Sequence, residues 1–368
     1  MQIPIPCLFM RGGTSRGPYF LASDLPQDLE LRDRVLLSVM GSPDARQIDG
    51  LGGADPLTSK AAIVSPSRRP GVDLEFLFAQ VLIDEARVDT TPNCGNMLAG
   101  VGPFALERGL VPASHAETTL RILTLNTDML CDVVLQTPGG RITYEGNARI
   151  DGVPGTSAPI KINFLDTAGS VCGTLLPTGK VADVFDGVQV TCIDNGMPVV
   201  LMRAADLARS GYETRDELNA DAELKARIEA IRLQAGPAMN LGDVRRKVVP
   251  KMCLIAAPKD GGTVCTRTFI PHDCHSAVGV LGAVTVASAC VLKGSVAAGV
   301  CRLPEGRTKL ISVEHPTGEF SVELELDAND PQTVQRSALL RTARPIMCGE
   351  VLIPSSVWDG RSSVKIAA

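Results

Sequence analysis

Two residues early in the sequence have side chains that could transfer protons, Cys94 and Lys60. Cys94 lies in residues 92–100, directly before an apolar run, and this pattern predicts that a helix starts there. Unpaired N–H groups and the helix dipole favour a thiolate at a helix N-terminus, and they favour a bound carboxylate as well. Two interpretations of Cys94 stay open from this segment, a reactive thiol and a small buried residue beside a tight turn.

Lys60 follows a loop rich in glycine and aspartate at residues 50–56 and precedes an apolar strand at residues 61–64. A lysine in such a place is most often a surface charge. If its amine is buried in a cleft, its pKa falls toward neutrality and it can act as a general base. Lys60 and Cys94 would then form a proton-transfer pair. The loop lacks the Gly-Lys-Ser/Thr ending of a phosphate-binding loop.

A glycine-rich turn at residues 11–17 can expose backbone N–H groups beside the side chains of Arg11, Thr14 and Ser15. Two helix N-termini, the Lys60 amine and this turn would together favour a ligand that carries several carboxylates.

His272, Cys274 and His275 form a second group with possible chemistry. The spacing permits a zinc site, although no matching Cys or acidic pair accompanies it. The favoured role of either histidine is to donate a hydrogen bond to a substrate or to cap a helix.

The spacing of apolar residues predicts two amphipathic helices, at residues 28–40 and 214–234, with Gly41 and Gly236 at their ends. The helix that follows Cys94 contains Pro103, which should kink it. A further helix, apolar around its whole circumference, is expected to begin near Ser276.

The layout of the first half recurs in the second half. In each, a strand leads through a short polar segment into a small-residue apolar helix, and a hairpin follows, at residues 134–142 and 312–320. A helix that is apolar all round must be enclosed on all sides. The sequence therefore predicts two copies of one unit, each a curved sheet around a central helix, with both helix N-termini pointing into one cleft.

Length and composition limit the classes of protein. At 368 residues, 45% of them hydrophobic, the chain is expected to form two domains with ample core. Its net charge of -5 argues against nucleic-acid and anionic-membrane partners. The 11 cysteines form no CxxC pair, and no secretory signal begins the sequence, so the cytoplasm is the expected location. The uncharged residues 276–292 are slightly too short for a membrane span.

Long motifs in the same order along nearly the whole chain resemble those of the PrpF family of isomerases, which have the diaminopimelate epimerase-like fold. The motifs are Met10-Arg11-Gly12-Gly13-Thr14-Ser15, Met40-Gly41-Ser42-Pro43-Asp44, Gln47-Ile48-Asp49-Gly50, Gly52-Gly53-Ala54-Asp55-Pro56-Leu57-Thr58-Ser59-Lys60, Asn93-Cys94-Gly95-Asn96, Asp194-Asn195-Gly196-Met197-Pro198, Met239-Asn240-Leu241-Gly242 and Phe269-Ile270-Pro271-His272.

The resemblance implies an α+β fold of two pseudo-symmetric domains, each a curved, mostly antiparallel, barrel-like sheet around a central apolar helix, with the active site in the cleft between them. We expect the first domain at residues 1–182, completed by a C-terminal strand within 338–353, and the second at 183–337. Within the family, the chain looks most like isomerases and tautomerases of 4-oxalomesaconate, from gallate, protocatechuate and lignin catabolism. The alternatives are an aconitate or methylaconitate isomerase and a non-catalytic carboxylate- or zinc-binding module.

The resemblance also implies cofactor-free acid/base catalysis in which Lys60 transfers the proton and Cys94 assists. No metal is expected, and a homodimer is possible. The residues expected to bind substrate are Arg11, Thr14, Ser15, Gly53, Ser59, Asn93, Gly95, Asn96, Met97, Arg267, His272 and Ser276. Two positions depart from the family pattern. Arg16 stands where Lys is usual, and Asp273 stands where Arg is frequent, so a positive contact with the substrate is in question there.

Overall fold

The structure is a computed structural model that describes residues 1–165, 167–330 and 332–360. The chain divides into two compact units: unit 1 contains residues 1–165 and the chain from 341 onward, and unit 2 contains residues 166–340. The boundaries proposed from the sequence lie after residues 182 and 337 instead. The difference concerns a segment that hydrogen-bonds within unit 2, since the N–H groups of Val171 and Cys172 donate to the Asp194 carboxylate at 2.8 and 2.7 Å.

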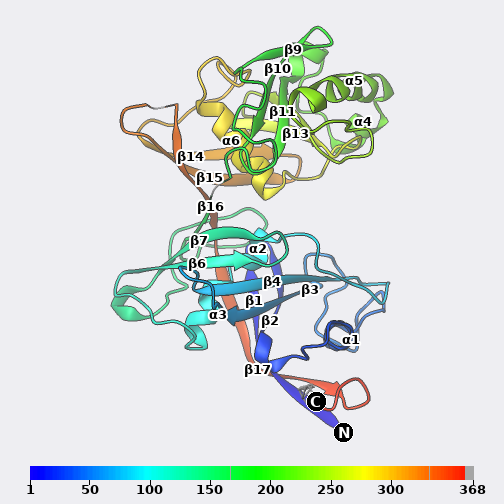
Figure 1. The fold of residues 1–368 in the computed structure, drawn as a ribbon, viewed down its shortest axis with the longest axis vertical. Helices are drawn as coiled ribbons and strands as arrows, with labels where there is room; N and C mark the ends of the chain where they lie inside the picture. The colour runs from blue at the N-terminus through cyan, green and yellow to red at the C-terminus, as the bar shows by residue number, and fades with distance from the viewer. Residues whose placement is uncertain (166, 331, 361–368) are drawn as a thin grey trace. The chain divides into compact units, whose positions relative to one another are not determined.

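Unit 1 is a sheet of long strands covered by short helices. Its strands are β1 (Gln2–Gly12), β2 (Ser15–Leu21), β3 (Lys60–Pro66), β4 (Leu74–Val81), β5 (Val88–Asp89), β6 (Glu117–Thr124), β7 (Met129–Gln136), β8 (Ile160–Phe164) and β17 (Ala343–Pro354). Its helices are α1 (Leu29–Met40), α2 (Gly95–Leu98), α3 (Val101–Glu107) and the 3-10 turns η1 (Ala22–Asp24) and η2 (Pro138–Gly140). The C-terminal strand β17 pairs antiparallel with β1, beside which it runs in Figure 1.

The two faces of this sheet bury different helices. Because side chains alternate along a strand, Ala61 and Ile63 of β3 pack with the apolar face of α1, and Lys60 and Ala62 point to the opposite face. That opposite face carries α2 and α3. The prediction for α1 is confirmed: Asp28 caps it by accepting a hydrogen bond from Leu31 N at 2.9 Å, and a left-handed Gly41 ends it.

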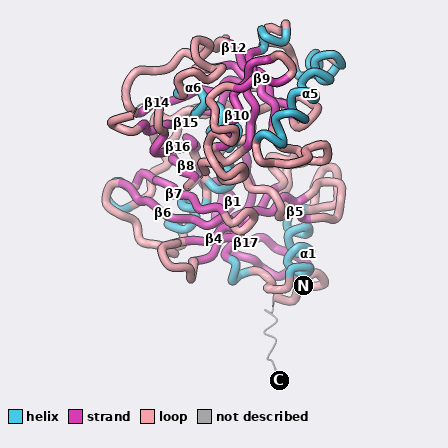
Figure 2. Tube along the Cα trace, turned by 45° about the horizontal axis from the view of Figure 1, so that its top comes forward, coloured by secondary structure: helices cyan, strands magenta, loops and turns pink. Residues whose placement is uncertain are grey.

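Unit 2 is built from β9 (Asp183–Phe185), β10 (Val188–Asp194), β11 (Pro198–Arg203), β12 (Lys251–Ala256), β13 (Val264–Phe269), β14 (Thr308–His315), β15 (Gly318–Leu326) and β16 (Val334–Arg341), whose last residue belongs to unit 1. Its helices are η3 (Ala204–Leu207), α4 (Arg215–Ala220), α5 (Ala222–Ala238) and α6 (Val280–Val291). Strands predominate along the chain, and α5 is the longest of the described helices (Figure 2). None of the described helices is long and apolar enough to cross a membrane.

The two units repeat one topology. From β1 to β8, leaving β5 aside, successive neighbours pair antiparallel, parallel, antiparallel, parallel, antiparallel and antiparallel. The run from β10 to β16 pairs in the same order. In each unit an outer helix or helix pair precedes the third strand, and an inner helix follows the fourth. The predicted pseudo-symmetric, mostly antiparallel units are confirmed.

The predicted hairpin match between the halves was misplaced. The counterpart of β14 and β15 is β6 and β7, whereas residues 134–142 contain only the end of β7 and the turn η2. Gly139 and Gly140 both adopt positive φ, of 67° and 76°, and the residues after them form no regular strand. Glycine provides this turn, but it does not open a hairpin.

Three predicted helix features differ in the structure. Pro103 does not kink a continuous helix, because the helix after Cys94 is already interrupted at Ala99 and Gly100, and Pro103 lies in the first turn of α3, where its missing N–H costs little. The helix predicted at residues 214–234 is divided at Asp221 into α4 and α5. Gly236 does not end α5 but lies inside it, since α5 continues to Ala238.

The inner helix of unit 2 begins later than predicted, at Val280 with Gly279 as its N-cap. The segment before it is held in turns, in which Ile270 N donates to Asp273 O at 3.0 Å and His275 N donates to Thr268 O at 2.8 Å. The helix itself is buried over most of its circumference, as its composition predicts.

Candidate active site

Lys60, the first residue of β3, is almost fully buried on the sheet face that carries α2 and α3, with 8% of its surface exposed. Its ammonium donates to Gln80 Oε1, directly across the β3–β4 ladder, and lies 4.9 Å from the centre of the Phe78 ring. Gln80 is oriented by its own amide, which donates to Ser59 O at 2.9 Å and Pro56 O at 3.1 Å. The hydrogen-bond partner of Lys60 is thus neutral. Burial lowers the pKa of Lys60, and the charges of Cys94 and Asp55 raise it by less.

Cys94 is half-buried and is the N-cap residue of α2, whose first turn leaves backbone N–H groups free to meet an anion. The charge of Cys94 influences the pKa values of three surrounding side chains. Burial raises the pKa of Tyr19 and lowers that of Lys60, and the charge of Cys94 raises both. Burial also lowers the pKa of Arg341 to about 9, while Cys94 raises it. Cys94 therefore lies at the centre of a cluster of buried ionisable side chains.

Asn96, in α2, links the glycine-rich hairpin to the end of β16. Its Nδ2 donates to Thr14 Oγ1 at 2.9 Å, and its Oδ1 accepts from Arg341 Nε at 3.1 Å. Arg341 was not predicted from the sequence. The one available signal is a single basic residue at the end of the strand segment 338–341, which is otherwise apolar, and it names no partner so distant in the chain.

We expect Asn96→Ala to lower the free energy of unfolding by about 1–3 kcal/mol, because it removes two side-chain hydrogen bonds and one of them is to a buried charge. Thr14→Val removes only the weaker, neutral bond and should cost about half as much or less. Urea denaturation of both variants checks the result. Equal stability of Asn96→Ala and the unchanged protein would show that Asn96 does not position Arg341.

The hairpin between β1 and β2 needs its glycines because α2 lies against it. A Cβ on Gly12 would stand 2.7 Å from the Tyr19 hydroxyl and would overlap the Asn96 carbonyl oxygen. Gly13 has φ 52°, and a Cβ there would stand 2.8 Å from Asn96 Cγ. The Arg-Gly-Gly-Thr sequence is therefore explained by the close approach of α2.

We expect Gly12→Ala to destabilise the protein by about 1–3 kcal/mol or more, since backbone atoms must move to admit the methyl group. Gly349→Ala on β17 is the matched control, because no atom lies within 4 Å of a Cβ there. Thermal unfolding of both variants checks the difference. A melting temperature for Gly12→Ala equal to that of the control contradicts the predicted packing.

Two predicted substrate-binding residues each carry a buried polar atom that has no hydrogen-bond partner among the described residues. Ser15 is 1% exposed, and its Oγ has no hydrogen-bond partner in the described part of the chain. Asn93 donates to Thr127 Oγ1, but its Oδ1 is buried without a partner in the same described part. A buried polar atom without a partner is costly, so both atoms are suited to a ligand.

Other predicted residues have protein partners. Ser59 is fully buried, donating to Val81 O at 2.7 Å and accepting from Gln47 Nε2 at 2.6 Å. Arg11 Nη1 donates to Gly13 O at 2.8 Å and to Thr342 Oγ1 at 2.9 Å. The Met97 carbonyl accepts from the Tyr19 hydroxyl at 2.7 Å. These hydrogen bonds fix the positions of residues around Cys94.

Gly53 and Gly95 can contribute only backbone groups to a ligand. Gly53 lies under Thr58, whose Oγ1 would stand 2.5 Å from a Cβ. Gly95 is the first residue of α2 and presents a first-turn N–H. The exposed Arg16 lies 5.9 Å above the Phe9 ring, so this departure from the family pattern is accommodated at the surface.

The predicted residues of unit 2 are Arg267, His272 and Ser276. Arg267 is 7% exposed and points inward, with Nε donating to Glu213 O at 2.7 Å and Nη1 to Thr266 O at 2.8 Å. His272 is half exposed, and its Nδ1 lies 3.5 Å from Glu229 Oε2. Ser276 accepts from Thr317 Oγ1 through its carbonyl at 2.8 Å.

The histidine and cysteine group has structural contacts. His275 Nδ1 accepts a hydrogen bond from Ala277 N at 3.0 Å. The backbone N–H of the buried Cys274 donates to Asn219 Oδ1 at 2.6 Å. Over residues 1–165, 167–330 and 332–360, no group of three or more His, Cys, Asp and Glu could hold a metal ion. Asp273 pairs with Lys225 at 2.8 Å, which gives this second departure from the family a partner within unit 2.

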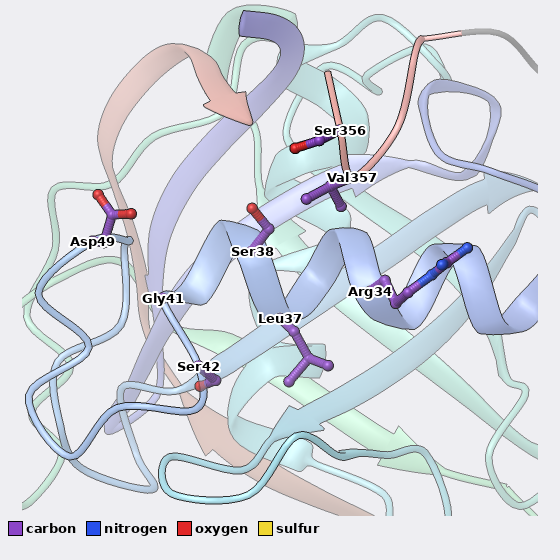
Figure 3. A pocket seen from close by; sticks show the side chains of 8 residues that line it. All are labelled: Arg34, Leu37, Ser38, Gly41, Ser42, Asp49, Ser356 and Val357. Carbon is purple, nitrogen blue, oxygen red and sulfur yellow. The ribbon is translucent and has the colours of Figure 1, made fainter. Parts of the chain in front are cut away.

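A shallow hollow in unit 1 lies apart from these residues. It is formed by α1, the loop after it and the segment after β17 (Figure 3). The lining residues are Arg34, Leu37, Ser38, Gly41, Ser42, Asp49, Ser356 and Val357, and none of them is a candidate of the site.

The family model described as PrpF protein matches residues 2–354. The chain belongs to the PrpF family. It is 61% identical over 348 residues to a (4E)-oxalomesaconate Delta-isomerase of Novosphingobium sp. (strain KA1), with 95% of this chain and 97% of the relative covered. It is 57% identical over 359 residues to a 4-oxalomesaconate tautomerase of Pseudomonas putida, with 98% and 99% covered.

Solved structures agree with this result. The crystal structure of a methylitaconate-delta-isomerase has a TM-score of 0.86 and 35% identity, and covers 99% of this chain and 98% of its own. A probable proline racemase from Agrobacterium radiobacter K84 has a TM-score of 0.51 and 13% identity, with 96% and 94% covered, which supports the fold alone. The predicted family, epimerase-like fold and isomerase class are confirmed.

Proposed function

We propose that this PrpF-family protein moves a proton within 4-oxalomesaconate, by keto-enol tautomerisation or by a 1,3-allylic shift of the double bond. The observation that carries the proposal is the pair Lys60 and Cys94, in which a buried amine with a neutral hydrogen-bond partner lies within electrostatic reach of a thiol at a helix N-terminus. The two curated relatives described above support the choice of substrate.

The proposed reaction begins when the neutral Lys60 amine removes a proton from a carbon next to the keto group or to a vinylogous carboxylate. The electron pair of that C–H bond moves into an enolate. First-turn N–H groups of Gly95 and Asn96 stabilise its negative charge. The proton then returns to a different atom, from Lys60 or from the Cys94 thiol, and the double bond has moved.

Burial of Lys60 serves this reaction because a base must be unprotonated to accept a proton. An amine with its ordinary pKa of 10.5 is almost entirely protonated at neutral pH, and burial lowers that pKa. Ser15 Oγ and Asn93 Oδ1 are buried without a hydrogen-bond partner among the described residues, and we propose both atoms for substrate contacts. Carboxylate binding by Arg11, Thr14, Ser59, Arg267, His272 and Ser276, and placement of the site in a cleft, stay predictions.

The purified protein tests the substrate by ultraviolet absorbance with 4-oxalomesaconate and, side by side, with aconitate and methylaconitate. We expect turnover of 4-oxalomesaconate with the highest kcat/KM and full activity in excess chelator. A higher kcat/KM with aconitate or methylaconitate would instead identify the protein as an aconitate or methylaconitate isomerase. Stoichiometric metal that is lost on changing His272 or His275 would favour a zinc-binding module instead.

We further propose a role in gallate- or protocatechuate-type aromatic catabolism, including lignin-derived compounds, which follows from the substrate. A cytoplasmic location is supported by the 11 cysteines, all of them free. No cofactor is invoked by this acid/base chemistry, and a homodimer stays a prediction.

A further inference from the structure

Gln80 contacts the Lys60 amine, and the proposed reaction gives it no task. The antiparallel ladder of β3 and β4 places Gln80 directly opposite Lys60. Side chains of directly opposed residues project to the same face of a sheet, so the two side chains meet within unit 1. There Gln80 Oε1 accepts a hydrogen bond from Lys60 Nζ.

The Gln80 amide is held in one orientation by the loop before β3. Its Nε2 donates to Pro56 O at 3.1 Å and to Ser59 O at 2.9 Å. Backbone carbonyl oxygens can only accept, so they require the NH₂ end of the amide, and the oxygen end must then face Lys60. Gln80 therefore presents a fixed acceptor to the amine.

This acceptor restricts how the Lys60 amine can turn. A neutral amine has two N–H groups and one lone pair, and the N–H given to Gln80 fixes the directions left for the lone pair. Phe78 lies two residues before Gln80 on the same face of β4, and its ring centre is 4.9 Å from Lys60 Nζ. A base that removes a proton from carbon must be held in the productive geometry, and these contacts hold it.

The acceptor is also neutral, which a glutamate at the same place would not be. An anion at hydrogen-bond distance favours the charged ammonium, whereas an amide oxygen adds no charge. The charges that influence Lys60 are those of Cys94, the N-cap of α2, and Asp55 in the loop before β3. Among the described residues Lys60 forms no salt bridge, so a carboxylate at position 80 would be its first.

We propose that Gln80 is a positioning residue of the proton transfer, which orients the Lys60 amine and, being neutral, leaves that amine free to lose its proton. This role rests on the proposed function of Lys60. It gives glutamine at position 80 a task that glutamate, of almost the same size, cannot perform.

The test compares pH profiles of kcat/KM for 4-oxalomesaconate in the unchanged protein and in Gln80→Glu. We expect Gln80→Glu to lower kcat/KM at neutral pH by about 10- to 1000-fold, because a close opposite charge raises the pKa of Lys60. Its activity should return as pH rises, since the rising limb moves to higher pH. A merely structural role would lower the rate at every pH and leave the limb in place. Gln27→Glu, which adds the same charge at an exposed position of unit 1, is the matched control. A limb of Gln80→Glu that coincides with that of the control overturns the proposal.

A second variant serves if Gln80→Glu does not fold, as circular dichroism would show. Gln80→Met keeps the length of the side chain but accepts no strong hydrogen bond from the amine. We expect kcat to fall by about 10- to 100-fold at every pH, with no shift of the limb to higher pH, because the amine loses its orientation without gaining a charged partner. A folded Gln80→Met protein with full kcat also overturns the proposal.

NMR of the protein with isotope-labelled lysine Cε separates this proposal from the proposed function, because it follows the titration of Lys60 without a substrate. The Lys60 signal is the one that is missing from Lys60→Met. If Gln80→Glu raises the pKa of Lys60 but the unchanged protein does not convert 4-oxalomesaconate, the substrate is wrong and the contact stands. If the protein converts 4-oxalomesaconate and Gln80→Glu moves neither the titration nor the limb, the substrate stands and the role of Gln80 is wrong.

Discussion

Replacing Lys60 with methionine is expected to lower kcat by about 10²- to 10⁴-fold, the usual contribution of a general base. The side chain keeps its length and its apolar contacts with Phe78 but loses the amine that accepts the proton. Lys293→Met is the matched control, because it removes an exposed amine and should leave kcat unchanged. Steady-state kinetics on both variants, with circular dichroism to compare their folds, measure the effect.

The stability of the Lys60→Met variant tests independently whether burial lowers the pKa of the Lys60 amine. Because burial lowers the folded-state pKa of Lys60, the unfolded chain binds more protons between that pKa and 10.5, and the native state is disfavoured as pH falls through this window. Methionine removes that effect. We therefore expect a melting temperature at neutral pH that is no lower than that of the unchanged protein. Full activity of Lys60→Met contradicts the proposed base.

Replacing Cys94 with alanine is expected to lower kcat by roughly 10²-fold, the lower end for an acid or base that acts in the transition state. The change removes a side chain that is only half-buried and makes no capping hydrogen bond to α2, so its effect on stability should be small. Cys94→Ser and replacement of the buried Cys131 by alanine are the comparisons. Serine keeps the size but not the acidity of the thiol. Cys131 is a buried, free cysteine of β7 that is not a candidate residue of the site.

Cys94→Ala should also move the pH dependence of kcat/KM. The value of kcat/KM rises with pH as Lys60 loses its proton, which gives the pH profile a rising limb. This limb lies below pH 10.5 because burial lowers the pKa of Lys60. The charge of Cys94 raises that pKa, so its removal should shift the limb to lower pH. A limb that stays in place would show that Cys94 acts without influencing Lys60, and an unchanged kcat would remove Cys94 from the mechanism.

The family could be predicted from the sequence because long motifs resemble those of its members in the same order, whereas proton transfer by Lys60 and Cys94 stays a prediction. The Arg-Gly-Gly-Thr hairpin needs glycines where Asn96 approaches, and Cys94 precedes an apolar helix. The repeat was visible for a similar reason, since a helix that is apolar on every side has few possible environments.

Residues that act through distant contacts could not be predicted in this way. Arg341 hydrogen-bonds Asn96 across 245 positions of the chain, and the single basic residue at the end of the apolar segment 338–341 does not indicate that partner. The start of α6 was misplaced because His275 and Ser276 resemble capping residues, whereas their backbone is held in turns and bridges to β13.

The central claim is that Lys60 moves a carbon-bound proton of the substrate. Its most direct test is proton NMR of 4-oxalomesaconate in deuterated water at catalytic enzyme concentration. The account predicts deuterium at one specific carbon with the unchanged protein and at none above the uncatalysed rate with Lys60→Met. An unchanged protein that introduces no site-specific deuterium, or a Lys60→Met variant that introduces it at the full rate, would contradict the account.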